Sequence, residues 1–133
     1  MAVDAVDMSS PVGKWKTIDD ATGQPKSLVE IIEKDGMLEG KIVELFRAPT
    51  EDQNPLCKEC EGDKKDQPIK GMVIMSALKK ERQKWTGGKI LDPKTGKVYN
   101  CYLKLVESGK KLEMRGFIGG ISLLGRTQIW ERQ

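Results

Sequence analysis

The chain has 133 residues, 38% of them hydrophobic, and a formal net charge of +3, which suits one domain with a single core. Its 23 basic and 20 acidic residues are scattered along the chain, so the composition does not indicate a nucleic-acid partner. The sequence contains no histidine. This excludes serine–histidine and cysteine–histidine nucleophile systems, histidine-ligated zinc and imidazole acid–base catalysis.

The N-terminal segment, residues 1–11, is expected to be disordered, and residues 12–133 are expected to form the single domain. The first ten residues lack the basic and apolar regions of a signal peptide. The longest uncharged stretch, Phe117–Gly125, is far shorter than the roughly 20 apolar residues of a membrane-spanning helix. Two interpretations remain open, namely a cytoplasmic protein or an exported one written without its signal peptide.

Apolar and polar residues alternate with a period of two along most of the chain, which predicts β-strands. Asp35-Gly36 is the strongest hairpin signal, because a type I′ turn needs positive φ at both central residues. Met72–Lys80 is also compatible with one or two helical turns. The expected strands, in chain order, are Val12–Asp19, Ser27–Lys34, Met37–Phe46, Lys70–Ser76, Gln83–Leu91, Lys97–Val106, Lys111–Ile118 and Ser122–Glu131.

About eight short antiparallel strands joined by hairpins, without β-α-β alternation, predict an all-β fold that is either a barrel or a sandwich. The sequential hairpins favour a small up-and-down antiparallel β-barrel, since closure removes exposed sheet edges. The long irregular segment Arg47–Pro68 contains three prolines and six acidic residues. A loop of this length in a compact domain is usually functional, mobile or locally pinned.

Two motifs at the ends of the chain resemble the structural signature of the lipocalins. Gly13-x-Trp15 lies on the first expected strand, and Arg126 lies on the last. The resemblance implies that Trp15 closes one end of an eight-stranded barrel and that Arg126 stacks across its indole. An alternative role for Arg126 is to pair with a ligand carboxylate. Only three residues follow Trp130, so the C-terminal helix of a typical lipocalin is expected to be lacking.

A longer resemblance covers the chain from Gly13 to Arg132. Its ordered motifs include Gly87-Gly88-Lys89-Ile90-x-Asp92-Pro93, Gly96-Lys97-x-Tyr99-x-Cys101 and Gly125-Arg126-Thr127-Gln128-x-Trp130. They resemble the bacterial domain-of-unknown-function family twenty-one forty-seven. This resemblance implies a lipocalin-like barrel that is usually exported, and it implies no established activity. We therefore expect a periplasmic or secreted protein, with the cytoplasm as the alternative.

The leading functional hypothesis is a non-catalytic binding protein of the bacterial envelope that holds a small apolar or amphipathic ligand in its barrel. No catalytic residue, metal or cofactor is expected. Arg115 faces solvent if Leu112 and Met114 face inward, and it faces the lumen if Gly116 reverses the strand. The candidate ligand-binding residues in the lumen or at its mouth are Leu38, Ile42, Phe46, Trp85, Tyr99, Leu103, Leu112, Met114 and Arg115.

The pair Cys57-Lys58-Glu59-Cys60 supports a second hypothesis, a redox or metal-binding role. The neighbouring Glu59 and Glu61 disfavour a reactive thiolate, so a structural disulfide between Cys57 and Cys60 is the main candidate. The alternative is a longer link from either residue to Cys101, which the chain-entropy model favours with about 4 kcal/mol against about 2 kcal/mol for the short loop. Cys101 is expected to be a small buried apolar residue. A third hypothesis is an interaction module whose barrel is fully packed and binds no ligand.

Overall fold

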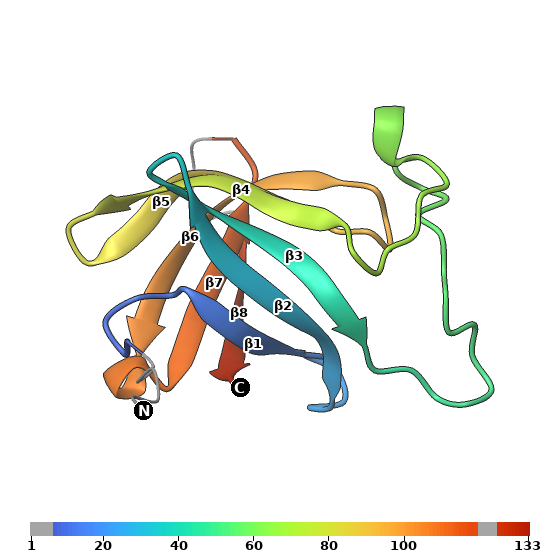
Figure 1. Ribbon diagram of the computed structural model, residues 1–133, viewed down its shortest axis with the longest axis horizontal. Coiled ribbons are helices and arrows are strands. Elements are labelled where there is room, and N and C mark those ends of the chain that lie inside the picture. The colour runs from blue at the N-terminus through green and yellow to red at the C-terminus, as the bar shows by residue number, and fades with distance from the viewer. Residues whose placement is uncertain (1–6, 120–124) are drawn as a thin grey trace, which may run out of the picture.

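The computed structural model describes residues 7–119 and 125–133. Eight antiparallel strands form a closed barrel in which each strand pairs with the next and β8 returns to β1 (Figure 1). The predicted all-β up-and-down barrel is confirmed. The strands are β1 (Gly13–Ile18), β2 (Pro25–Lys34), β3 (Met37–Leu45), β4 (Val73–Glu81), β5 (Lys84–Leu91), β6 (Val98–Val106), β7 (Lys111–Phe117) and β8 (Gly125–Arg132).

The turns follow the chemistry expected from the sequence, but β4 does not follow the helical alternative. Asp35 and Gly36 have φ values of 55° and 77°, as the tight turn between β2 and β3 requires. Residues 72–80 lie largely within β4, so the helical alternative is wrong. A register shift opposite Gly40 and a positive φ at Ala77 interrupt the alternation of β4, which explains why its sequence imitates a helical period.

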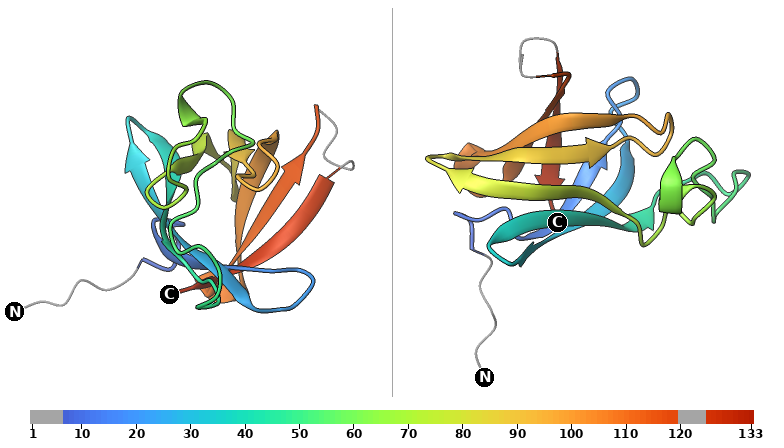
Figure 2. Two further views of the ribbon diagram at one scale, coloured as in Figure 1. Left: turned by 90° about the vertical axis from the view of Figure 1, so that its right-hand side faces the viewer. Right: turned by 90° about the horizontal axis from the view of Figure 1, so that it is seen from above.

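The two ends of the barrel are built differently (Figures 1 and 2). At one end β1 begins and β8 ends, and the short 3-10 turn Glu107–Gly109 joins β6 to β7. We call this the plug end. At the other end β3 leads into the irregular segment 46–72, which carries the 3-10 turn Gly62–Lys64. We call this the loop end. The predicted start of the last strand at Ser122 lies outside the described residues.

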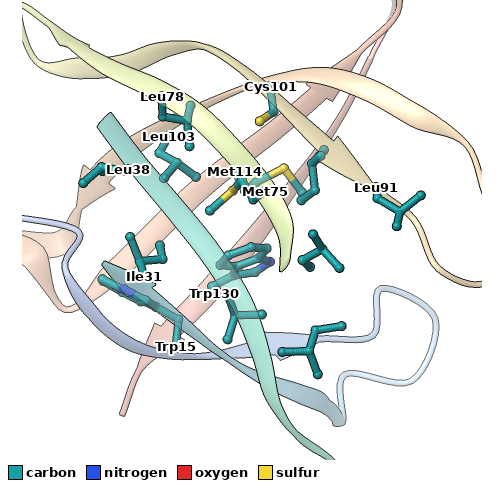
Figure 3. Close-up of a cluster of buried hydrophobic side chains, with 14 of the residues drawn as sticks. Trp15, Ile31, Leu38, Met75, Leu78, Leu91, Cys101, Leu103, Met114 and Trp130 are labelled. Atoms are coloured by element: carbon teal, nitrogen blue, oxygen red, sulfur yellow. The ribbon is translucent and has the colours of Figure 1, made fainter. Parts of the chain in front are cut away.

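The barrel interior is filled by its own side chains (Figure 3). Trp15 and Trp130 are the two largest of the fully buried side chains. They come from neighbouring strands β1 and β8, and they lie among aliphatic side chains from the rest of the sheet. This packing agrees with the geometry of an eight-stranded barrel, whose interior is just wide enough for side chains.

The barrel closes through a short seam between β1 and β8. Among the described residues, Trp15–Arg132 and Lys16–Glu131 are the two pairs across it, with an additional bond from the Gln133 amide to the Lys14 carbonyl. By contrast, β7 and β8 share seven residue pairs. The closure is therefore concentrated at the plug end, around Arg132.

The segment before β1 covers the plug end rather than leaving it exposed. Pro11 is fully buried, and the backbone of Met8 lies against Gly109 closely enough to exclude any Cβ there. The sequence predicts disorder for residues 1–11. Residues 7–11 instead form defined contacts, whereas residues 1–6 lie outside the described part of the chain.

Candidate functional site

The plug end is sealed by an arginine stacked on a tryptophan. The guanidinium carbon of Arg132 lies 4.3 Å from the centroid of the Trp15 ring, a cation–π geometry. Arg132 also donates hydrogen bonds to the carbonyl oxygens of Gly109 at 2.8 Å and Ser10 at 2.9 Å. The Trp15 indole donates to the Pro11 carbonyl at 2.8 Å. The Arg132 side chain therefore links three parts of the chain at the plug end, namely the segment before β1, β1 itself and the turn between β6 and β7.

The backbone geometry at position 13 explains why a glycine lies two residues before Trp15. Its φ is +140°, and a Cβ there would lie 3.3 Å from Nη1 of Arg132. A side chain at this position would thus crowd the guanidinium and strain the backbone. Gly13 and Trp15 therefore both lie at the plug end, beside Arg132.

The predicted partner of Trp15 is wrong, because Arg132 rather than Arg126 stacks on the indole. Both arginines lie on β8 and share its inward parity with Trp130, but six residues place them about 20 Å apart along an extended strand. Arg126 lies at the loop end, where its side chain is 77% exposed and pairs with Asp20 at 3.1 Å.

Most of the residues predicted to line a ligand lumen belong to the hydrophobic core itself. Tyr99 packs against this core from the loop end, and Trp85 is buried near the plug end beneath Lys80. Each buried side chain contacts other protein side chains, as expected for a packed interior. The predicted lumen residues found in this core are Leu38, Ile42, Leu103, Leu112 and Met114.

Phe46 departs from its expected inward position. The pairing of β2 with β3 shifts between Leu28 and Val29, which leaves Val43 as an extra residue on β3. This bulge reverses the alternation beyond it. Leu45 consequently packs against the core, whereas Phe46 is 42% exposed on the outer surface.

Arg115 lies on the outer face of β7, next to the buried Met114, and its guanidinium Nη1 donates to the Thr127 hydroxyl at 2.7 Å. Its cross-strand neighbour is Tyr102, whose ring is half-buried and lies under the Lys84 ammonium group. Because Leu112 and Met114 face inward, the lumen alternative for Arg115 is wrong.

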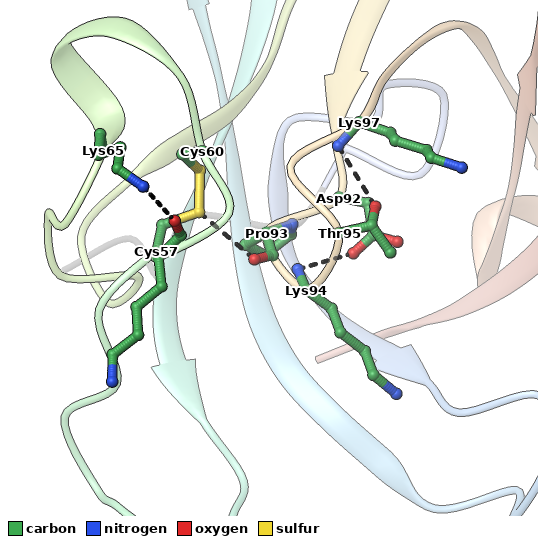
Figure 4. The surroundings of a disulfide bond; sticks show 9 residues. Cys57, Cys60, Lys65, Asp92, Pro93, Lys94, Thr95 and Lys97 are labelled. Atoms are coloured by element: carbon green, nitrogen blue, oxygen red, sulfur yellow. Dashed lines mark hydrogen bonds between the residues drawn. A yellow bond between two sulfur atoms is a disulfide. The ribbon is translucent and has the colours of Figure 1, made fainter.

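A disulfide anchors the long segment at the loop end (Figure 4). Cys57 and Cys60 are bonded, with Cα atoms 5.4 Å apart, and both are buried. The Cys57 sulfur lies 3.3 Å from the Pro93 carbonyl oxygen. A Cβ on Gly96 would overlap the Glu59 carbonyl group, so the disulfide turn packs directly on the β5–β6 hairpin.

This contact extends the hydrophobic core beyond the barrel interior, to the disulfide segment. Ile90 and Leu91 are consecutive in β5 and point to opposite faces, yet both are buried. Ile90 belongs to the barrel interior, whereas Leu91 lies with Ile74 beside the disulfide segment. The irregular segment is thus held against the barrel by buried contacts.

Loss of the disulfide is expected to weaken this attachment without unfolding the barrel. Replacing Cys57 and Cys60 together by alanine should lower the free energy of unfolding by about 2 kcal/mol, the chain-entropy value for so short a loop. Intact mass under non-reducing conditions should show a two-proton deficit in the parent protein and none in the variant. Absence of that deficit from the air-exposed parent protein would contradict the bond.

The free thiol of Cys101 should be inert in the folded protein. Cys101 is buried, and desolvation raises its pKa to about 12, so at mildly basic pH almost no thiolate is present. We expect iodoacetamide to leave the native protein unmodified and to label one thiol per chain after unfolding in denaturant. Rapid labelling of the native protein would contradict this assignment.

The described residues form two surface hollows at the loop end that could hold a small molecule. The larger, about 530 Å³, is lined by Lys16, Gln24, Pro25, Leu45, Phe46 and Arg47. We call it the β1–β3 hollow. The smaller, about 370 Å³, lies between the disulfide segment and strands β4 to β6. Sequence reasoning missed Lys16, Leu45 and Arg47, because no motif marks them and only the bulge at Val43 brings Phe46 beside them.

Other classes of site receive no support from the described residues. Within 7–119 and 125–133, no group of three or more cysteine, aspartate or glutamate side chains is placed to hold a metal ion. In the same part of the chain, no helix has the length and apolar character needed to cross a membrane.

Comparisons with known proteins agree with this architecture. No curated protein matches the chain. A solved structure described as "Protein HP1028 from the human pathogen Helicobacter pylori belongs to the lipocalin family" aligns with 93% of this chain and 83% of its own, with a TM-score of 0.79 and 21% sequence identity. That similarity shows a shared lipocalin-like fold. Residues 13–132 match the family model described as "Uncharacterized protein conserved in bacteria (DUF2147)", and the chain therefore belongs to that family.

Proposed function

We propose that the protein is a non-catalytic binding protein of the bacterial envelope that holds a small amphipathic ligand at the loop end of its barrel. The observation that carries this proposal is the contrast between the two ends. The plug end is sealed by Trp15 and Arg132, whereas the loop end carries the β1–β3 hollow, with an exposed aromatic ring at its surface.

The packed interior directs the ligand to this hollow rather than to the centre of the barrel. Two buried tryptophans and the aliphatic side chains around them already occupy the centre. The volume of about 530 Å³ falls within the range of small-molecule sites. Pro25, Leu45 and Phe46 supply apolar surface, and Lys16, Gln24 and Arg47 supply polar groups. A molecule with one apolar and one polar end matches this lining.

The envelope location is supported by the buried disulfide. Disulfides form and persist in oxidising compartments such as the periplasm and the extracellular space, and they are rare in the cytosol. Both cysteines are buried and bonded to each other, which suits a structural role. A redox role would require an accessible sulfur for thiol exchange, so the buried geometry favours the structural interpretation.

The proposal is tested by titrating the isotope-labelled protein with octanoate and with 1-octanol, and following its backbone amide signals by nuclear magnetic resonance. We expect saturable shifts centred on the amides of residues 16, 24 and 45–47. Phe46→Ala should weaken binding about tenfold, the loss expected for one buried aromatic contact. Ile32→Ala is the matched control, because Ile32 is also 42% exposed but lies towards the plug end; its binding should equal that of the parent.

A surface interaction module is the second candidate, and the packed interior favours it. If neither amphiphile produces saturable shifts, or if Phe46→Ala and Ile32→Ala bind like the parent, ligand binding at the loop end is refuted. The protein would then act through its outer surface alone.

A further inference from the structure

We propose that the β1–β3 hollow selects for negative charge, so that its preferred ligand is a free single-chain carboxylate amphiphile. This inference rests on the proposed function and specifies its ligand class. It assigns charge recognition to Lys16 and Arg47 and apolar contact to Phe46.

The lining of the hollow carries charge of one sign only. Lys16 and Arg47 are its two ionised residues, and the other lining residues are neutral. The acidic residue of β3 that adjoins the lining residue Leu45 is Glu44, and its carboxylate is paired with Lys70 at 3.7 Å. None of the lining residues is acidic, so an anionic headgroup in the hollow would meet the two cations Lys16 and Arg47 among them.

The guanidinium of Arg47 is held in place by an uncharged partner. Its Nη1 donates to the backbone carbonyl oxygen of Asp52 at 2.8 Å. The turn that presents this carbonyl is closed by two further bonds, one from the Ala48 amide to the Glu51 carboxylate and one from the Gln53 side chain to the Ala48 carbonyl. The guanidinium is thus oriented while its positive charge stays uncompensated by an ion pair in the described structure.

Lys16 supplies a second positive charge from a rigid element. It lies on the outer face of β1, between Leu28 on β2 and Glu131 on β8. Glu131 is its acidic cross-strand neighbour, yet the described residues contain no ion pair between the two. The hydrophobic Leu28 flanks the side nearer to the hollow, so the ammonium group stands beside apolar surface.

This arrangement favours a carboxylate over a neutral headgroup for a physical reason. Arginine presents a planar pair of donors that matches a carboxylate, and such charge-assisted bonds are about twice as strong as neutral ones. Burial of an alkyl chain against Pro25, Leu45 and Phe46 makes the binding free energy of either ligand more favourable. The alkyl chain therefore contributes to the affinity of both ligands, and the difference in affinity comes from the headgroup.

The test compares octanoate with 1-octanol, which share an alkyl chain and differ in charge at neutral pH. We expect octanoate to bind about tenfold more tightly at low salt, and high salt to reduce this advantage. In the variant Lys16→Gln/Arg47→Gln the octanoate advantage should disappear, while the affinity for 1-octanol stays within twofold. The control Lys34→Gln/Lys110→Gln removes the same charge from exposed turns at the plug end and should keep the full advantage.

The outcomes separate this inference from the proposed function. Equal affinities for the two ligands in the parent protein, or an octanoate advantage that survives in Lys16→Gln/Arg47→Gln, would overturn charge selection, and binding sensitive to Phe46→Ala would still support a ligand site. Absence of binding by both ligands would overturn the two proposals together. Equal loss of the advantage in the plug-end control would show non-specific charge attraction and would also refute the site.

Discussion

Replacing Arg132 by glutamine is expected to lower the free energy of unfolding by about 2–4 kcal/mol, the range for breaking a partly buried charged hydrogen-bond network. The substitution removes the ring contact with Trp15 and the two short bonds to the Gly109 and Ser10 carbonyls. Those carbonyls belong to the segments that cover the plug end. Because β1 and β8 share only two residue pairs in the described structure, the loss should also loosen the closure of the barrel.

The matched control is Arg126→Gln on the same strand. Its salt bridge with Asp20 is largely exposed, and exposed pairs contribute about 0–1 kcal/mol. Urea denaturation of both variants measures the two changes directly, and hydrogen exchange should show faster opening of β8 in Arg132→Gln only. Equal destabilisation by the two substitutions would refute the assignment of Arg132 as the plug arginine.

Truncating Leu112 to alanine should lower the free energy of unfolding by about 2–5 kcal/mol, the usual range for a fully buried leucine. Leu112 is fully buried and pairs with Trp130 across β7 and β8, so its removal leaves a cavity against the indole. A residue that merely lines a ligand-filled lumen would tolerate truncation far better. The size of the loss therefore tests whether the predicted lumen residues are structural.

Ile129→Ala provides the comparison for Leu112→Ala. Ile129 lies on the outer face of β8 and is 40% exposed. Its truncation should therefore lower the free energy of unfolding by less than about 1 kcal/mol, as is usual for surface substitutions. Thermal and urea denaturation should rank the two variants clearly. A loss for Leu112→Ala as small as that for Ile129→Ala would indicate an interior with room for a ligand and would contradict the packed barrel.

The choice between Arg126 and Arg132 shows where sequence reasoning reaches its limit. Both residues follow the inward parity of Trp130 on the same strand, and alternation cannot distinguish two positions of equal parity. Strand register determines which of the two arginines stacks on Trp15, because Trp15 lies opposite Arg132 at the short seam between β1 and β8. Register across this seam joins residues at opposite ends of the chain, and no local pattern encodes it.

The β1–β3 hollow depends on a second non-local feature. Alternation along β3 places Phe46 inside with Leu38 and Ile42, and the single extra residue at Val43 turns it outward. A bulge leaves little trace in the apolar pattern. Arg47 also gains its orientation from a turn closed by side-chain bonds, which composition and spacing do not reveal.

The amino-acid sequence by itself determined the all-β class, the approximate positions of eight strands, the tight turn at Asp35-Gly36, the plug tryptophan and the family. These properties follow from local periodicity, turn chemistry and ordered motifs, which short stretches of chain carry. Only the tertiary structure decided the plug arginine, the packed interior and the cationic hollow at the loop end. Those depend on strand register, a bulge and the docking of a long loop, and each is set by contacts between residues far apart in the chain.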